Sequence, residues 1–321
     1  MMSKNRKKYL ALCGGVGGAK LALGLSRVLE PGCLTIVVNT GDDFEHMGLL
    51  ICPDIDTVTY TLSGVVESRQ GWGRADETWN VLDQVERLGG ETWFRLGDKD
   101  IALHLMRRSL LAQGFSLSEV TARITQSLAI DHAIIPMSDD PIRTEVVVDG
   151  GVMPFQHYFV KQHCQPRIVG IRYAGAEKAT ISSGFNGALN DKELAGVIIC
   201  PSNPFLSIDP LLALPGVSEL LRTISVPVVA VSPIVGGRAI KGPTAKIMQE
   251  LDMPVTQEAI ADHYQGLVSG LMIDSVDKAT ASELNKRLAV HTCDTVMTNI
   301  TQKVALANKC LAFIDSLDKR S

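Results

Sequence analysis

Residues Tyr9 to Lys20 read YLALCGGVGGAK, an apolar run that passes into a glycine-rich segment ending in a lysine. Apolar residues recur at helical spacing after it, so we predict that the glycines lie between a β-strand and the start of an α-helix. The first N–H groups of a helix have no partner within it, and its N-terminus carries a partial positive charge. This arrangement predicts a phosphate-binding turn, to which Lys20 adds a full charge.

The segment matches neither of the two common glycine motifs. Lys20 stands where the dinucleotide fingerprint G-x-G-x-x-G has its last glycine, and Leu21 stands where the P-loop has Ser or Thr. A glycine-rich turn that binds no phosphate is therefore an open alternative. A nicotinamide-dependent dehydrogenase is disfavoured, because the last glycine is missing and the acids after the next strand exceed what a ribose needs.

The composition limits the kind of protein and its partners. The chain has 321 residues, of which 45% are hydrophobic, and a net charge of −4, so we expect one large or two modest domains and no nucleic-acid partner. Its seven cysteines include no C-x-x-C pair, which favours reduced thiols in a cytoplasmic protein. The apolar run before Gly14 is too short for a membrane span, so we expect no membrane partner.

The order of the predicted elements indicates the fold class. We expect an α/β fold: a Rossmann-like, doubly wound, mostly parallel sheet with a helical insertion and a β-hairpin. The expected strands are 9–13, 34–38, 133–136, 195–200 and 226–231, with short ones at 271–274 and 289–292. The nucleotide-binding core would comprise 1–56 and 133–321, and the mostly helical insertion 57–132 would contribute to the acceptor site. Residues 144–160 are predicted to form the hairpin, as an antiparallel ribbon on the main sheet.

Four of these strands end in loops rich in Gly, Ser, Asn or Asp. In open parallel sheets ligands bind at the carboxyl ends of the strands, so the loops predict a nucleotide-type site. Four aspartates between residues 42 and 56 suit Mg²⁺ bound together with a substrate phosphate. The alternative is a set of helix-capping aspartates in solvated loops. The loop 236–244 adds Arg238 and Lys241, which can meet phosphates.

The predicted chemistry is phosphoryl-group transfer, which depends mainly on positioning and charge neutralisation. No Ser-His-Asp or Cys-His arrangement and no H-E-x-x-H pattern indicates a nucleophile or a zinc site. The three tryptophans all lie within the predicted insertion. They either wall a flat ring ligand or pack helices together, and the sequence leaves both possibilities open.

Several motifs, taken in order, resemble those of the CofD family, the 2-phospho-L-lactate transferases of coenzyme F420 biosynthesis. They are GGVGGAK at 14–20, NTGDD at 39–43, CPDIDT at 52–57, GWG at 71–73, DETW at 76–79, LGDKD at 96–100, PSNP at 201–204 and SPIVGG at 232–237. The resemblance covers nearly the whole chain. It implies a Rossmann-like fold with a helical insertion, and usually a homodimer.

The resemblance also implies a reaction. A member of this family transfers a phospho-acid from a guanosine diphospho-linked donor to the deazaflavin Fo and releases GMP, with Mg²⁺ present. The attacking group would be the terminal ribityl hydroxyl of Fo. The acid is 2-phospho-L-lactate, phosphoenolpyruvate or 3-phospho-D-glycerate, and a few pocket side chains would decide between them.

Site residues follow from the same resemblance. It assigns catalysis to Asp42 and Asp56, and Fo binding to Asp54, Asp56, Trp79 and Arg95. It assigns Mg²⁺ to Asp42, Asp43 and Asp56. The guanine nucleotide would be held by Gly15, Gly17, Gly18, Lys20, Ser202, Asn203, Ser232, Gly236, Gly237 and Lys241.

A non-catalytic regulator is the alternative function. Proteins of the gluconeogenesis-factor (YvcK-like) type share the glycine turn and the sheet, and they resemble nucleotide-sugar binders. The motifs CPDID, GWG and DETW are associated with the transferases, so the enzyme is favoured.

Overall fold

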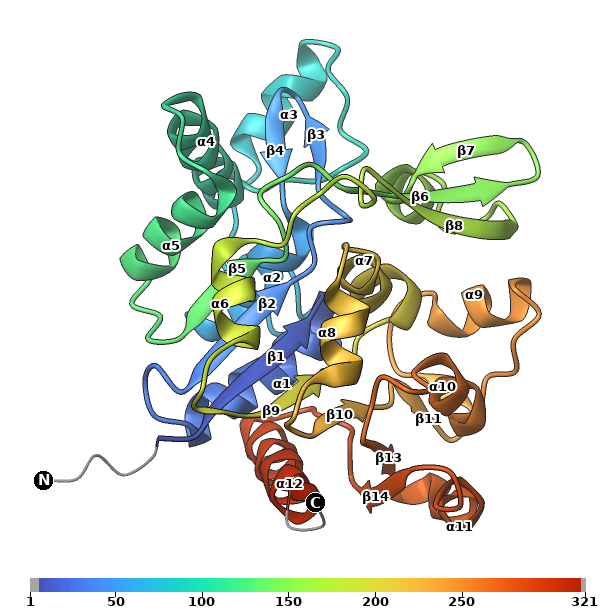
Figure 1. Cartoon of the computed structure of the whole chain (residues 1–321). Helices are drawn as coiled ribbons and strands as arrows, with labels where there is room; N and C mark the ends of the chain where they lie inside the picture. Colours follow the sequence, from blue (N-terminus) through green and yellow to red (C-terminus); the bar gives the residue numbers. More distant parts are fainter. Residues whose placement is uncertain (1–5, 319–321) are drawn as a thin grey trace, which may run out of the picture.

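The computed structural model describes residues 6–318, so the outermost residues of the predicted core, 1–5 and 319–321, lie outside the described part. Its main sheet has seven strands in the order β14-β13-β10-β9-β1-β2-β5, and every neighbouring pair is parallel (Figure 1). The strands are β1 (Lys8–Cys13), β2 (Leu34–Val38), β5 (Ala133–Pro136), β9 (Leu194–Ile199), β10 (Val228–Val231), β13 (Gly270–Asp274) and β14 (Ala289–Cys293). The predicted α/β fold with a parallel sheet is confirmed.

The strand order reverses at β1. From β1 the chain runs through β2 to β5 on one side, and then crosses to β9 and continues through β10, β13 and β14 on the other. Because the two halves diverge there, a crevice opens at the carboxyl ends of β1 and β9, where Leu12 pairs with Ile199. The glycine-rich turn follows β1 directly and so lies in that crevice.

Helices bury both faces of the sheet, which explains why its strands read as continuous apolar runs. On one face α1 (Gly15–Val28), α2 (Pro53–Leu62) and α12 (Ile300–Asp318) cover Ala11, Ile36 and Ile198. On the other, α6 (Ser183–Leu189), α8 (Val217–Thr223) and α10 (Gln257–His263) cover Leu12 and Ile199. Shorter elements complete the core: η2 (Pro204–Ile208), α7 (Asp209–Leu212), β11 (Ile234–Val235), β12 (Arg238–Ala239), α9 (Thr244–Glu250), η3 (Ser275–Thr280) and α11 (Ala281–Leu284).

The segment between β2 and β5 is mostly helical. It contains α3 (Asn80–Arg87) and α4 (Asp98–Ala112), which Figure 1 shows beyond the end of the sheet, and α5 (Leu117–Ser127), which packs beside β5. The boundary predicted between residues 56 and 57 falls inside α2, which packs against α1 and the sheet. A short antiparallel hairpin, β3 (Phe44–His46) with β4 (Leu49–Ile51), precedes α2 and was not predicted.

Two local predictions are wrong. The hairpin does not lie on the main sheet: β6 (Arg143–Val148) pairs with β7 (Gly151–Pro154) on one side and β8 (Ile168–Ala174) on the other, in a separate antiparallel sheet. Both edges of β6 are therefore hydrogen-bonded within this sheet. After β7 the chain forms a π-helix, η1 (His157–Lys161). Of the glycines, only Gly14 lies between β1 and α1, because the helix already begins at Gly15.

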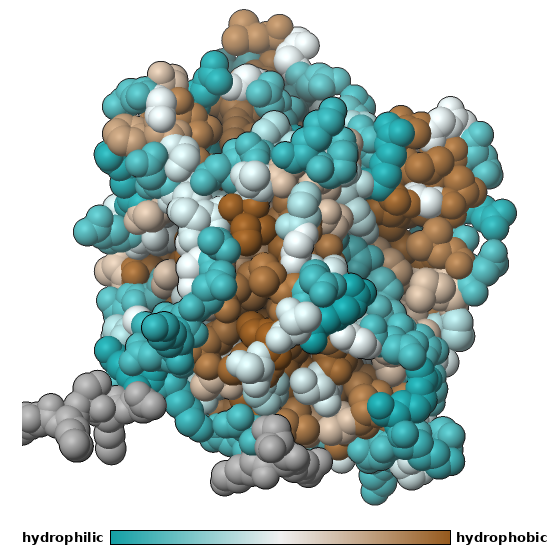
Figure 2. Space-filling view, viewed as in Figure 1, coloured by the Kyte–Doolittle hydropathy of each residue, from teal (hydrophilic) through white to brown (hydrophobic). Residues whose placement is uncertain are grey.

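Apolar side chains are exposed on the small antiparallel sheet and beside it. Figure 2 shows them as a brown area over β6, β7 and β8, to which Val152 and Val169 contribute. Between residues 6 and 318 no single helix is long and apolar enough to cross a membrane. One bent pair of helices, 204–212 with 217–223, is long and apolar enough for a span by length and composition. Its Leu206, Leu211 and Leu221 are buried in the core.

Candidate functional site

A cleft of about 750 Å³ lies at the carboxyl ends of the main strands. The glycine turn and the loops after β9, β10 and β14 form its base, and the insertion and the segment after β7 form its walls. Its lining includes Gly14–Gly17, Lys20, Asp42, Asp54, Asp56, Tyr60, Trp72, Trp93–Arg95, Asp100, His104, Phe155, Phe159, Ser202, Asn203, Ser232, Lys241 and Thr295–Thr298. Of the polar loops predicted after the strands, those after β1, β2, β9 and β10 line the cleft, whereas residues 137–140 after β5 do not.

The glycines of the turn have two different tasks. Gly15 has a φ of +60°, a conformation that favours glycine. The nearest atom to an ideal Cβ on Gly15 is Ser207 Oγ at 3.8 Å, so there is space beside the backbone at this position. A Cβ on Gly17 would lie 2.1 Å from the Pro201 carbonyl oxygen, and one on Gly18 would lie 2.6 Å from the Ser202 hydroxyl. These two glycines let α1 pack closely against the loop after β9, and Gly18 does not line the cleft.

Two lysines face the cleft near this turn. Lys20 Nζ donates to the Met297 carbonyl at 2.9 Å, and Lys241 Nζ donates to the Gln70 carbonyl at 2.6 Å. Burial, followed by the charges of Lys241 and Lys303, lowers the pKa of Lys20. An anion placed here would relieve this repulsion.

The loops after β9 and β10 supply polar groups. Ser202 Oγ donates to the Gly14 carbonyl at 2.7 Å and so ties the loop after β9 to the glycine turn. Asn203 Oδ1 accepts from two amides of η2, while its buried Nδ2 has no partner in the described part of the chain. Asn203 lines the cleft, and this amide group has hydrogen-bonding capacity that the described residues do not use. Ser232 lines the cleft, whereas Gly236 and Gly237 lie outside the lining and Gly236 N donates to Asp277.

Asp42 and Asp43 follow β2 and are both buried. One oxygen of each, Oδ1, has no hydrogen-bond partner among the described residues. Burial and then the charge of Asp54 raise the pKa of Asp42 well above its usual range, and burial raises the pKa of Asp43 to about 8 against the opposing charge of Arg143. Asp42 lines both the cleft and a neighbouring cavity of about 360 Å³, and Asp43 lines only the latter.

The two aspartates at the start of α2 are already engaged. Asp54 accepts from the Gly15 amide at 2.7 Å and from Asn39 Nδ2 at 2.9 Å, so it lies at the glycine turn. Both oxygens of Asp56 contact the guanidinium of Arg107. Within residues 6–318 no three acidic, His or Cys side chains are grouped as a metal site. Mg²⁺ typically uses one or two carboxylates together with substrate phosphates, so the free oxygens of Asp42 and Asp43 fit it.

Aromatic residues wall the other end of the cleft. Phe155 and Phe159 are stacked with their centroids 5.3 Å apart. Trp72 is 53% exposed and follows Gly71, whose Cβ position lies 2.7 Å from Val16 of the glycine turn, so the chain at Trp72 runs beside that turn. Trp93 lines the cleft and packs against Phe44 of β3, with 5.8 Å between centroids, so it joins loop to hairpin and does not pack helices together. The guanidinium of Arg95 lies over the ring of Trp79 at 4.4 Å; Arg95 lines the cleft and Trp79 does not.

Comparison with known proteins establishes the family of this chain. The family model described as 2-phospho-L-lactate transferase CofD matches residues 10–308. This chain belongs to the CofD family. The match includes every loop that contributes to the cleft.

Named relatives of this CofD-family chain carry two different descriptions. A phosphoenolpyruvate transferase of Streptomyces griseus is 35% identical over 317 residues, covering 97% of this chain and 99% of the relative. A 2-phospho-L-lactate transferase of Methanococcoides burtonii is 39% identical over 299 residues, covering 93% and 95%. A crystal structure of a UPF0052-family protein from Bacillus halodurans has the same fold, with a TM-score of 0.62 at 14% identity, covering 95% and 99%.

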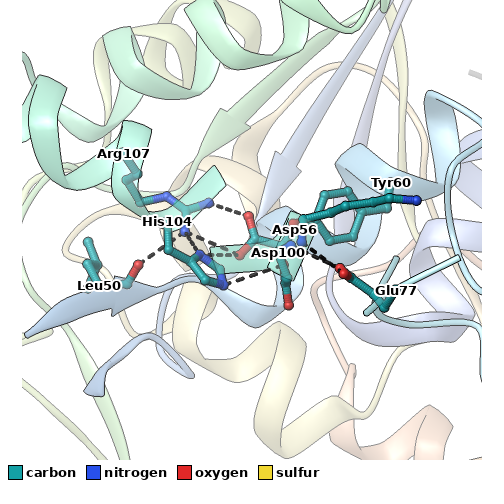
Figure 3. Close-up of polar contacts among 8 residues, drawn as sticks. Leu50, Asp56, Tyr60, Glu77, Asp100, His104 and Arg107 are labelled. Atoms are coloured by element: carbon teal, nitrogen blue, oxygen red, sulfur yellow. Dashed lines mark hydrogen bonds and ion pairs between the residues drawn. The ribbon is translucent and has the colours of Figure 1, made fainter. Parts of the chain in front are cut away.

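The CofD-family site also contains residues that the sequence analysis did not single out. They are Tyr60 on α2 and Asp100, His104 and Arg107 on α4. Figure 3 shows them joined by hydrogen bonds and ion pairs to one another and to the predicted Asp56. The signal was present as spacing, since Asp56 and Tyr60, like Asp100 and His104, are four residues apart on one helix face. The segment Thr295–Thr298 after β14 was also missed, because it carries no charge or glycine.

Proposed function

We propose that this chain transfers a phospho-acid from a guanosine diphospho-linked donor to the deazaflavin Fo, in coenzyme F420 biosynthesis. In this reaction a hydroxyl of Fo attacks the phosphorus next to the acid, a new O–P bond forms, the bond to GMP breaks, and the hydroxyl proton is released to solvent. The observation that carries the proposal is one continuous cleft with a helix N-terminus and lysines at one end and an aromatic wall at the other. The family membership and the two relatives support it.

The nucleotide end is assigned to the glycine turn and the loops beside it. The N-terminus of α1 favours an anion, although the Gly15 N–H already donates to Asp54, and Lys20 and Lys241 add positive charge. The unpartnered Asn203 Nδ2 supplies a further donor. Together these groups would hold the diphosphate while the hydroxyl attacks, which is the positioning that such a transfer needs.

The acceptor end is assigned to the aromatic wall. A deazaflavin has a flat, largely apolar ring, and Phe159 and Trp93 offer apolar faces on which such a ring can stack. Arg95 lines the same part of the cleft and can meet polar atoms at the edge of the ring. The ribityl chain of Fo would then point from this wall toward the diphosphate.

Mg²⁺ is proposed as the cofactor, held by Asp42 and Asp43. Their unpartnered buried oxygens support this assignment. When bound, the ion would neutralise charge on the phosphates. Asp56 is a weaker candidate ligand, because Arg107 occupies both of its oxygens.

The test is a turnover assay read by mass spectrometry. Purified protein, Fo and Mg²⁺ are mixed separately with the guanosine-linked donors of 2-phospho-L-lactate, phosphoenolpyruvate and 3-phospho-D-glycerate. A product with the mass of Fo plus one phospho-acid, together with GMP, is expected with one donor and identifies it. Tight nucleotide binding without a product from any donor would instead favour the regulator. The homodimer stays a prediction, which light scattering after size exclusion can check.

A further inference from the structure

Asp100 is held in an unusual position on the wall of the cleft. It lies in the first turn of α4, and its side chain is 16% exposed, toward the cleft that it lines. Its Oδ1 accepts a hydrogen bond from the Tyr60 hydroxyl. Its backbone amide donates to Glu77 Oε1 at 2.9 Å, so the residue is fixed from both sides (Figure 3).

A second donor faces the same oxygen. Arg107 Nη1 lies 3.0 Å from His104 Nδ1, and because a guanidinium can only donate, Nδ1 must accept. The ring proton is then on Nε2, which lies 3.4 Å from Asp100 Oδ1, within ion-pair distance but without the geometry of a hydrogen bond. The chain of contacts from Asp56 through Arg107 and His104 therefore fixes the tautomer that directs a donor at Asp100.

The other oxygen of Asp100 is left for a ligand. No donor within residues 6–318 binds Oδ2, although the carboxylate borders a cleft large enough for two substrates. A carboxylate whose partner oxygen already faces two donors is a weak base but a strong hydrogen-bond acceptor. This favours binding a hydroxyl over removing its proton.

The location within the cleft agrees with this role. Asp54 contacts the glycine turn, and Tyr60, which holds Asp100, is six residues further along α2. At 1.5 Å per residue the backbone of Tyr60 is about 9 Å along the helix axis from that of Asp54. Asp100, which projects from α4, therefore lines the cleft from its wall and not from the glycine turn.

We propose that Asp100 positions the acceptor by accepting a hydrogen bond from a hydroxyl of its ribityl chain. The inference rests on the proposed function, since it takes Fo as the acceptor. Tyr60 and His104 orient the carboxylate, and Arg107 acts through His104. Asp100 thereby selects acceptors that carry a hydroxylated chain.

The experiment compares wild type, Asp100→Asn and Tyr60→Phe with a matched control, Asp83→Asn, an exposed acid in the first turn of α3. Steady-state kinetics use Fo and the donor identified in the turnover assay. Fo binding is also measured directly by fluorescence titration, and thermal unfolding checks that each variant folds. A deazaflavin with an alkyl chain in place of the ribityl chain is the second probe in the titration.

We expect Asp100→Asn to raise KM and Kd for Fo by about 10- to 100-fold, the range for a charged hydrogen bond. KM for the donor and the Kd of the alkyl analogue should not change, and Tyr60→Phe should give a smaller shift in the same direction. A lower kcat with an unchanged KM for Fo, or equal losses for Fo and the alkyl analogue, would overturn the proposal. Wild type that binds Fo without turnover would refute the transferase while leaving the binding comparison valid.

Discussion

Arg107 and Asp56 form an ion pair beneath the cleft, with Arg107 Nη1 3.2 Å from Asp56 Oδ2 and Nη2 in contact with Oδ1. Arg107 is only 1% exposed, and its Nη1 also donates to the Leu50 carbonyl at 3.1 Å. The pair joins α4 of the insertion to α2 of the core. It therefore determines where the wall of the cleft stands relative to the glycine turn.

Removing one member of this ion pair should lower the stability of the protein. Arg107→Met leaves the Asp56 charge buried without its partner, and we expect the free energy of unfolding to fall by about 3–5 kcal/mol. Urea denaturation measures this. The double variant Asp56→Leu/Arg107→Met should recover most of the loss, because no unpaired charge is left. A double variant as unstable as the single one would show that packing, and not charge, is responsible.

Gly17 should tolerate no side chain. In Gly17→Ala the new Cβ would meet the Pro201 carbonyl oxygen at 2.1 Å, and backbone must move to relieve the contact. We expect a loss of about 1–3 kcal/mol in urea denaturation, as for overpacking in a core. Gly187→Ala is the matched control, because that position lies in α6 with open space around its Cβ. It should be neutral or stabilising by up to about 1 kcal/mol.

Asp43 should make the stability of the metal-free protein depend on pH. Its pKa is about 8 in the folded protein and about 3.9 when unfolded, so its stabilising contribution is complete below pH 4 and is lost as pH rises toward 8. Thermal unfolding in EDTA from pH 5 to 8.5 should show a flatter decline for Asp43→Asn than for wild type. Parallel curves would contradict the raised pKa.

Mg²⁺ should reverse this loss in the wild type. Protons compete with the ion for Asp42 and Asp43, so added Mg²⁺ should raise Tm more at pH 8 than at pH 6. Asp43→Asn should reduce the shift at pH 8. An equal shift in the variant would place the ion elsewhere.

Lys20 should contribute to nucleotide affinity. Lys20→Met keeps most of the apolar stem but removes a half-buried charge from the cleft, so we expect GDP to bind about 10-fold more weakly in calorimetry. The salt dependence of binding should also decrease. Lys303→Met is the control, because Lys303 is near enough to affect the pKa of Lys20 but does not line the cleft. An equal loss of GDP affinity in both variants would indicate that Lys20 acts through the general electrostatic potential and not by contacting the nucleotide.

Much of the fold followed from the sequence, because hydrophobic periodicity depends on residues that are neighbours in the chain. The predicted strands at 9–13, 34–38 and 133–136 agree with β1, β2 and β5 to within a residue. The convergence of polar loops also followed, since parallel strands place their carboxyl ends at one edge of a sheet. The hairpin was misplaced because alternation in 144–148 predicts a half-buried strand but does not say which sheet it joins.

The sequence alone thus determined the parallel sheet, the glycine turn at its centre and the loops that border the cleft. Only the tertiary structure decided which carboxylates are free. Asp42 and Asp56 look alike in sequence, but Arg107, 51 residues from Asp56, neutralises one and leaves the other with an unpartnered oxygen. Such pairing depends on how α4 packs over α2. The sequence pattern of each segment predicts its own secondary structure but not how two distant segments pack together.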